Sequence, residues 1–146
     1  MAKFTSEIIV KRPLKEVWGK YMDPANHSRW ISGYRSSEPI QGNHGEEGSR
    51  HRYVIAHNGR DVTMEQTVTA VRQNEEFAYV MRAPAMVSEV WVDFSERGPD
   101  ATKLIWNATV KGSGLVSSMS LLFSSGGARK RVEADLASFK KFVESS

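Results

Sequence analysis

The sequence has 146 residues, with 20 basic and 17 acidic side chains, a formal net charge of +3 and no cysteine. That length predicts one domain over residues 1–146. The lack of cysteine excludes disulfides, thiolate nucleophiles and thiolate metal ligands, and favours a cytoplasmic protein. The N-terminal stretch MAKFTSEIIV is too polar for a signal peptide and no segment could span a bilayer, so we expect no stable membrane insertion.

The basic residues are scattered along the chain. The densest group, residues 129–131, is followed at once by Glu133 and Asp135. A nucleic-acid-binding protein usually shows a dense basic stripe. We therefore interpret this group as a solvated helix face and expect no nucleic-acid partner.

The first forty residues predict one strand, two short helices and a second strand. Phe4 to Val10 alternate as a strand, and Pro13 suits the first turn of a helix. The apolar side of that helix comprises Val17, Trp18 and Tyr21. Asp23-Pro24 ends it and starts a second short helix through His27 to Trp30, and a strand from Tyr34 to Ile40 follows.

Five consecutive strands are predicted between Gly48 and Lys111, because apolar residues alternate there with polar ones. Short turns, such as Asn58-Gly59 and Gly98-Pro99-Asp100, separate them and favour antiparallel neighbours. The predicted inward residues are His51, Tyr53 and Ile55; Val62, Met64, Gln66, Val68 and Ala70; Phe77, Tyr79 and Met81; Val90, Val92 and Phe94; and Leu104, Trp106, Ala108 and Val110.

The C-terminal segment predicts a long helix with two apolar stripes. One stripe is Val132, Leu136, Phe139 and Val143; the other is Leu115, Met119 and Leu122. The stripes face different directions, and Gly126-Gly127 lies between them. We expect a kink or break there, with the C-terminal half on the sheet and the first half over a pocket mouth.

These elements resemble the START-like, helix-grip superfamily (SRPBCC), in its polyketide cyclase/dehydrase-like branch. The resemblance rests on Val10, Pro13, Val17-Trp18, Asp23-Pro24 and Trp30, in this order, and on later stretches such as SEVWVDF and RVEADLASFKKFVE. It implies an α+β helix-grip fold: a curved antiparallel sheet of about seven strands, wrapped around a long C-terminal helix, with two short helices between strands 1 and 2. It also implies an internal cavity for a lipid, a polyketide or an aromatic-like molecule. The superfamily has no common catalytic motif and implies no cofactor here.

The strand parities predict which side chains line the cavity. Tyrosine, tryptophan and glutamine would orient a ligand against an adaptable wall of methionine and aromatic groups. Gln66 stands out, because a buried amide needs a ligand or a neighbour such as Tyr53 or Tyr79. The predicted ligand-binding residues are Trp30, Tyr53, Met64, Gln66, Tyr79, Met81, Val92, Trp106, Met119 and Phe123.

No residue set declares a reaction. The four histidines are His27, His44, His51 and His57, and their spacing fits no metal site well. His51 or His57 could act as a general base, but neither has an adjacent serine-and-acid arrangement.

Three functions remain open from the sequence. The first is binding of a small hydrophobic molecule in the cavity, for transport or sensing. The second is a polyketide cyclase or dehydratase reaction in the same cavity. The third is a protein-interaction module, or a homodimer, that uses Trp91 on the outer sheet face.

Overall fold

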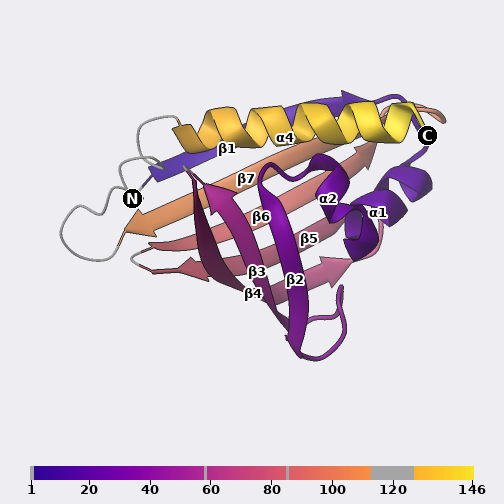
Figure 1. Cartoon of the computed structure of the whole chain (residues 1–146). Helices are drawn as coiled ribbons and strands as arrows, with labels where there is room; N and C mark the ends of the chain where they lie inside the picture. The colour runs from indigo at the N-terminus through magenta and orange to yellow at the C-terminus, as the bar shows by residue number, and fades with distance from the viewer. Residues whose placement is uncertain (1, 58, 85, 113–126) are drawn as a thin grey trace.

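The computed structural model of the chain describes residues 2–57, 59–84, 86–112 and 127–146. Strands and helices follow the predicted order (Figure 1). The strands are β1 (Ala2–Val10), β2 (Tyr34–Gln41), β3 (Arg50–His57), β4 (Arg60–Arg72), β5 (Glu76–Ala83), β6 (Met86–Glu96) and β7 (Thr102–Gly112). The helices are α1 (Leu14–Met22), the 3₁₀ turn η1 (Pro24–Asn26), α2 (His27–Trp30) and α4 (Gly127–Glu144).

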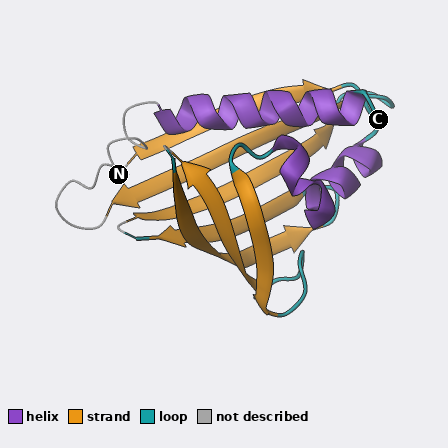
Figure 2. Ribbon diagram, viewed as in Figure 1, coloured by secondary structure: helices purple, strands orange, loops and turns teal. Residues whose placement is uncertain are grey.

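All seven strands form one antiparallel sheet in the order β1-β7-β6-β5-β4-β3-β2. Each strand from β2 to β6 pairs with the next along the chain, and β1 closes the series beside β7. The sheet curves, with α4 lying along β1 and with α1 and α2 at one end (Figure 2). This arrangement confirms the predicted α+β helix-grip fold, including the two short helices between the first two strands.

The predicted inward parity is confirmed along β3, β6 and β7. His51, Tyr53 and Ile55 are buried, although both parities of β3 carry apolar residues. β4 differs near its end, because a register shift between Val68 and Ala70 inserts an extra residue. The bulge turns Ala70 outward and brings Val71 against the core instead, so the prediction for Ala70 was wrong.

The predicted C-terminal apolar stripe faces the core. Leu136, Phe139 and Val143 are buried, and α4 contacts β1, α1 and α2. α4 begins at Gly127, at the predicted position of the break. The predicted first half of the helix, with its apolar stripe, lies outside the described residues.

Glu144 links the C-terminal end of α4 to the end of β1 through hydrogen bonds. Its Oε2 accepts the Lys11 backbone N–H at 2.7 Å and the Lys140 ammonium at 2.6 Å. These hydrogen bonds, that of Lys140 first, lower the pKa of the Glu144 carboxyl. The Arg12 guanidinium donates to the Glu144 carbonyl, so the helix cannot slide along the strand without losing several polar contacts.

The α1–η1–α2 segment packs through aromatic rings. The predicted apolar side of α1 is buried, and Asp23 caps η1 by accepting the Ala25 N–H at 3.0 Å. The ring of Tyr21 lies 5.1 Å from that of Trp30 and 5.3 Å from that of Phe139 on α4. These contacts join the short helices to the long one.

Gly33 makes the tight turn between α2 and β2. Its φ of +71° is left-handed, and a Cβ there would lie 2.2 Å from the carbonyl oxygen of Ala56 on β3. The Gly33 carbonyl also accepts the Ala56 N–H at 2.7 Å. This position therefore requires glycine both for its conformation and for the close approach of β3.

We predict that Gly33→Ala lowers the free energy of unfolding by about 3 kcal/mol, because the clash adds to the left-handed penalty. Gly59→Ala is the matched control, since Gly59 has a φ of +76° and no described atom lies within 4 Å of its added Cβ. Only the conformational penalty of about 1 kcal/mol applies there. Urea denaturation measures both, and equal losses would contradict the role of the close approach.

Candidate functional site: an internal cavity

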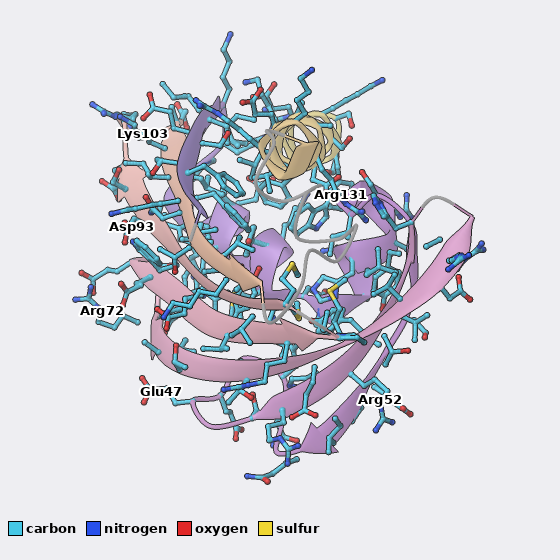
Figure 3. All side chains as sticks on the ribbon, turned by 90° about the vertical axis from the view of Figure 1, so that its left-hand side faces the viewer. Glu47, Arg52, Arg72, Asp93, Lys103 and Arg131 are labelled. Atoms are coloured by element: carbon cyan, nitrogen blue, oxygen red, sulfur yellow. The ribbon has the colours of Figure 1, made fainter. Side chains whose placement is uncertain are left out.

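A cavity of about 200 Å³ lies between the inner face of the sheet and the helices. Figure 3 looks along α4 and shows the sheet curving beneath the helix. The described lining residues are mostly apolar or aromatic: Phe4, Tyr21, His27, Trp30, Ile31, His44, Tyr53, Ile55, Met64, Gln66, Phe77, Tyr79, Met81, Met86, Ser88, Val90, Trp106, Val110, Arg131, Val132, Asp135 and Leu136.

Seven of the ten residues predicted from the sequence to bind a ligand lie on the cavity wall. Val92 does not line the cavity: it is fully buried in the core, paired in register with Phe77 and Trp106. Met119 and Phe123 lie outside the described residues. The seven on the wall are Trp30, Tyr53, Met64, Gln66, Tyr79, Met81 and Trp106.

The wall is chemically uneven. Toward β5, β6 and β7 it is apolar apart from Tyr79, Ser88 and the Trp106 indole. Toward α2, β3 and β4 it presents a set of hydrogen-bonding side chains that we call the polar side: His27, Trp30, His44, Tyr53 and Gln66. A ligand in this cavity would therefore have a preferred orientation.

Gln66 has a neighbour of the kind that the sequence required. The Tyr53 hydroxyl donates to Gln66 Oε1 at 3.5 Å, and both side chains are buried. The distance is at the long limit for a hydrogen bond, so the amide is only weakly satisfied. A ligand polar group could improve its hydrogen bonding.

Three of the four histidines meet at the polar side, which the sequence spacing did not reveal. The ring of His44 lies 5.4 Å from that of His27 and 5.1 Å from that of His51. They come from α2, from the loop between β2 and β3, and from β3. Gly42 and Gly45, both at positive φ, flank His44 and let this loop fold back onto the end of α1.

Burial keeps these imidazoles neutral. Desolvation, followed by the neighbouring His44, lowers the pKa of His27 to about 4. The pKa of His44 is lowered by desolvation and by His51, while Asp23 opposes the shift of both His27 and His44. Desolvation also lowers the pKa of His51, whose Nε2 lies 3.3 Å from the Ser49 hydroxyl oxygen. Among the described residues, no group of three or more histidine or acidic side chains is arranged to hold a metal ion.

Tyrosines of the cavity are also uncharged. Desolvation is the largest cause that raises the pKa of Tyr21, Tyr53 and Tyr79, which keeps all three hydroxyls protonated. They offer hydrogen bonds without adding charge to the wall.

The two charged wall residues, Arg131 and Asp135, belong to α4, and each contacts residues outside that helix. Asp135 Oδ1 accepts the Ser32 N–H at 3.0 Å and also the Ser32 hydroxyl. Arg131, labelled in Figure 3, donates to the Ser32 carbonyl at 2.7 Å, and its Nη1 lies 3.0 Å from His57 Nδ1. Desolvation raises the pKa of Asp135 despite the opposing hydrogen bonds from Ser32 and the charge of Arg131.

Two buried polar atoms on the polar side have no hydrogen-bond partner within the described part of the chain. They are His27 Nδ1 and Trp30 Nε1. Their residues lie three positions apart on α2, so both side chains project from one side of that helix. A buried unpaired group costs about 1–3 kcal/mol, which marks this place as incompletely satisfied.

We predict that acid destabilises this protein through the histidine cluster. The folded-state pKa of His27, about 4, is below the unfolded value of about 6.5, so its stabilising effect is complete above pH 6.5 and is lost as pH falls toward 4. Between pH 7.5 and 5.0, His27 alone should account for about 2 kcal/mol of lost stability.

His27→Gln should remove that share of the pH dependence, because the amide does not titrate. Urea denaturation of both proteins at pH 7.5 and 5.0 measures it, and the unchanged carboxylates cancel in the comparison. The same loss of stability in both proteins would show that His27 is not held neutral by burial.

Comparisons with known proteins give the family. A family model described as "Polyketide cyclase / dehydrase and lipid transport" matches residues 1–144. Among curated proteins, no sequence matches this chain. In the described part of the chain, no helix is long and apolar enough to cross a membrane.

Solved structures share the fold at low sequence identity. A conserved protein from Geobacillus kaustophilus is 19% identical, with a TM-score of 0.79 over 99% of this chain and 96% of that one. The Zhui aromatase/cyclase from Streptomcyes sp. R1128 is 13% identical, with a TM-score of 0.79 over 97% and 93%. A START superfamily protein from Mycobacterium smegmatis is 14% identical, with a TM-score of 0.79 over 99% of each chain. These likenesses show a shared fold, and the family match over residues 1–144 shows that the chain belongs to the polyketide cyclase/dehydrase and lipid transport family.

Proposed function

We propose that this protein binds one small hydrophobic molecule in its internal cavity, for transport or sensing. The observation that carries the proposal is the cavity of about 200 Å³, lined mainly by apolar and aromatic side chains with a few polar groups on one side. Such a combination is typical of sites that bury an apolar body and orient it by one polar end.

The free-energy cost of leaving the cavity empty favours a bound ligand. At about 24 cal/mol per Å³, an empty apolar cavity of this size would cost on the order of 5 kcal/mol. Whole domains are stable by only about 5–15 kcal/mol. A bound apolar molecule removes much of that cost, so binding and stability are coupled.

The size of the cavity limits its ligand. Drug-sized molecules occupy pockets of roughly 300–1,000 Å³, which is more than the 200 Å³ found here. Methionines Met64, Met81 and Met86 line it and adapt their shape readily. A compact ligand of one or two rings suits this space better than a long lipid chain.

Tyr53, Gln66 and Tyr79 would orient the ligand. All three line the cavity, and Tyr53 and Gln66 are already linked by a long hydrogen bond. Their neutral hydroxyl and amide groups can donate to or accept from a ligand without the desolvation penalty of an ionised group.

A cyclase or dehydratase reaction in the same cavity is the second candidate. The family description and the similarity to an aromatase/cyclase support it. Proton transfer needs a group whose pKa lies near the working pH. Burial moves the pKa values of His27 and the tyrosines away from neutral pH, whereas it raises the pKa of Asp135 toward neutral pH. Asp135 is therefore the acid–base residue that we favour for this alternative. Most of the other wall residues are better explained by ligand binding than by catalysis.

The interaction-module alternative has less support. Trp91 lies on the outer sheet face as predicted, but it is only partly exposed, beside Ala78 and Asn107. A cytoplasmic location and a homodimer remain predictions.

We predict that Ser88→Leu weakens binding by occupying part of the cavity. Ser88 is 8% exposed and lines the wall from β6, so leucine there occupies ligand space. The uncharged fluorescent probe naphthalene should bind at least ~10-fold more weakly, equivalent to about 1.4 kcal/mol. The free energy of unfolding should stay the same or rise, because the substitution fills apolar space.

Ser95→Leu is the matched control, since Ser95 is exposed on the same strand. Fluorescence titration of the wild type and both variants measures the effect. Equal probe affinity in all three proteins would place the ligand elsewhere and overturn the proposed function.

A further inference from the structure

We propose that one end of this molecule is a docking surface for an anionic lipid bilayer. The surface, which we call the basic patch, surrounds the C-terminal end of α4 and carries seven cations: Lys11, Arg12, Lys15, Lys20, Arg29, Lys140 and Lys141. None of the seven is among the described residues that line the cavity, so this inference stands independently of the proposed function.

Hydrogen bonds join the end of β1 to the end of α4 within the basic patch. Glu144 accepts the Lys140 ammonium at 2.6 Å and the Lys11 N–H at 2.7 Å. The Arg12 guanidinium donates to the Glu144 carbonyl. Figure 1 shows α1 next to this end of α4, so both helices contribute to one surface.

Further side-chain contacts add α1 and α2 to the same surface. Glu16 on α1 lies 3.9 Å from Arg12 Nε and 3.5 Å from Lys20 Nζ. The Lys20 ammonium is 5.7 Å from the centre of the Phe142 ring on α4, and the Arg29 guanidinium carbon is 6.0 Å from that centre. The basic patch is therefore continuous across three helices and the end of β1.

The positive charge of the molecule is concentrated in the basic patch. With its two carboxylates, Glu16 and Glu144, the patch carries a net charge of +5, whereas the whole chain carries +3 and the rest of it therefore −2. Counting Asp23, at the end of α1, still leaves +4 in the patch. Lys15 and Lys141 are exposed, and within the described part of the chain neither forms an ion pair. Such a concentration of charge attracts a polyanion.

The kind of cation favours a bilayer over a nucleic acid. Five of the nine lysines of the chain belong to the basic patch, but only two of its eleven arginines do. Lysine is a point charge on a flexible stem, whereas the planar arginine suits bidentate contacts with fixed phosphates. Clusters of about four to eight basic side chains bind anionic headgroups, which form a diffuse and fluid layer of charge.

Exposed apolar side chains accompany the cations. Ile9 is 48% exposed, and its carbonyl accepts the Lys140 ammonium at 2.7 Å, so it lies at the margin of the basic patch. Phe142 is partly exposed between Lys20 and Arg29. The boundary between headgroups and acyl chains receives apolar side chains while the surrounding cations stay at the headgroups. A nucleic-acid backbone offers no such environment to an isoleucine.

Sedimentation with lipid vesicles at pH 7.5 tests the proposal. We expect the wild-type protein to bind vesicles of phosphatidylcholine with about 30% phosphatidylglycerol at least ~10-fold more tightly than vesicles of phosphatidylcholine alone. Raising the NaCl concentration from about 0.1 M to about 0.5 M should abolish most of this binding, because the Debye length falls from about 10 Å to about 4 Å.

Two double variants of equal net charge test the assignment to the basic patch. Lys15→Gln with Lys141→Gln should weaken binding to the anionic vesicles ~25-fold, or ~5-fold for each lysine. Lys111→Gln with Lys130→Gln is the matched control, because both lysines are exposed and lie outside the patch, at the other ends of β7 and α4. The control should change the affinity less than ~2-fold. Urea denaturation should give the same stability for all three proteins, since every substitution is at an exposed lysine.

Each other outcome would overturn the proposal. Equal binding to neutral and anionic vesicles, or binding to neither, would show that the basic patch does not recognise an anionic bilayer. Equal losses in the two double variants would show that only net charge matters. If the protein binds single-stranded DNA but not the vesicles, and Lys15→Gln with Lys141→Gln weakens that binding, the patch is a nucleic-acid surface instead. Naphthalene binding in the cavity should be the same in all three proteins, so failure of either proposal leaves the other standing.

Discussion

The packing of α4 against the inner face of the curved sheet is the constraint on which the rest of the structure depends. A single sheet leaves one apolar face without a second layer, and burial of that face drives folding. Phe139 and Val143, both fully buried, supply that layer beside β1, and Glu144 fixes the end of the helix. The helix follows one margin of the sheet, so the concave face of β3 to β6 stays uncovered by it. That face becomes the cavity wall.

The same burial determines the chemistry of the cavity. Side chains that titrate in water are held in their neutral forms: the tyrosines protonated, and the clustered imidazoles unprotonated. Arg131 and Asp135 carry charge at the helix, where Ser32 and His57 engage them. The wall of the cavity is therefore mainly apolar, and most of its titratable side chains are uncharged. Proton transfer near pH 7 needs a group whose pKa lies near that pH, and burial raises the pKa of Asp135 in that direction.

The sequence predicted the fold well because alternation and turns are local signals. It predicted seven of the wall residues for the same reason, since inward parity places a side chain on the concave face. It failed at Ala70, where a bulge changes the parity, and at Val92, which has inward parity but lies in the packed core. The histidine cluster could not be predicted, because His27, His44 and His51 meet only when the β2–β3 loop folds back.

Native mass spectrometry of the freshly purified protein tests the central claim, a cavity that binds one small hydrophobic molecule. The account predicts a second mass species, heavier by one small molecule, or its appearance after addition of one apolar probe. Extraction would then identify a small hydrophobic compound. A single ligand-free mass that remains unchanged after addition of such probes would contradict the account, because an apolar-lined cavity of this size should bind them.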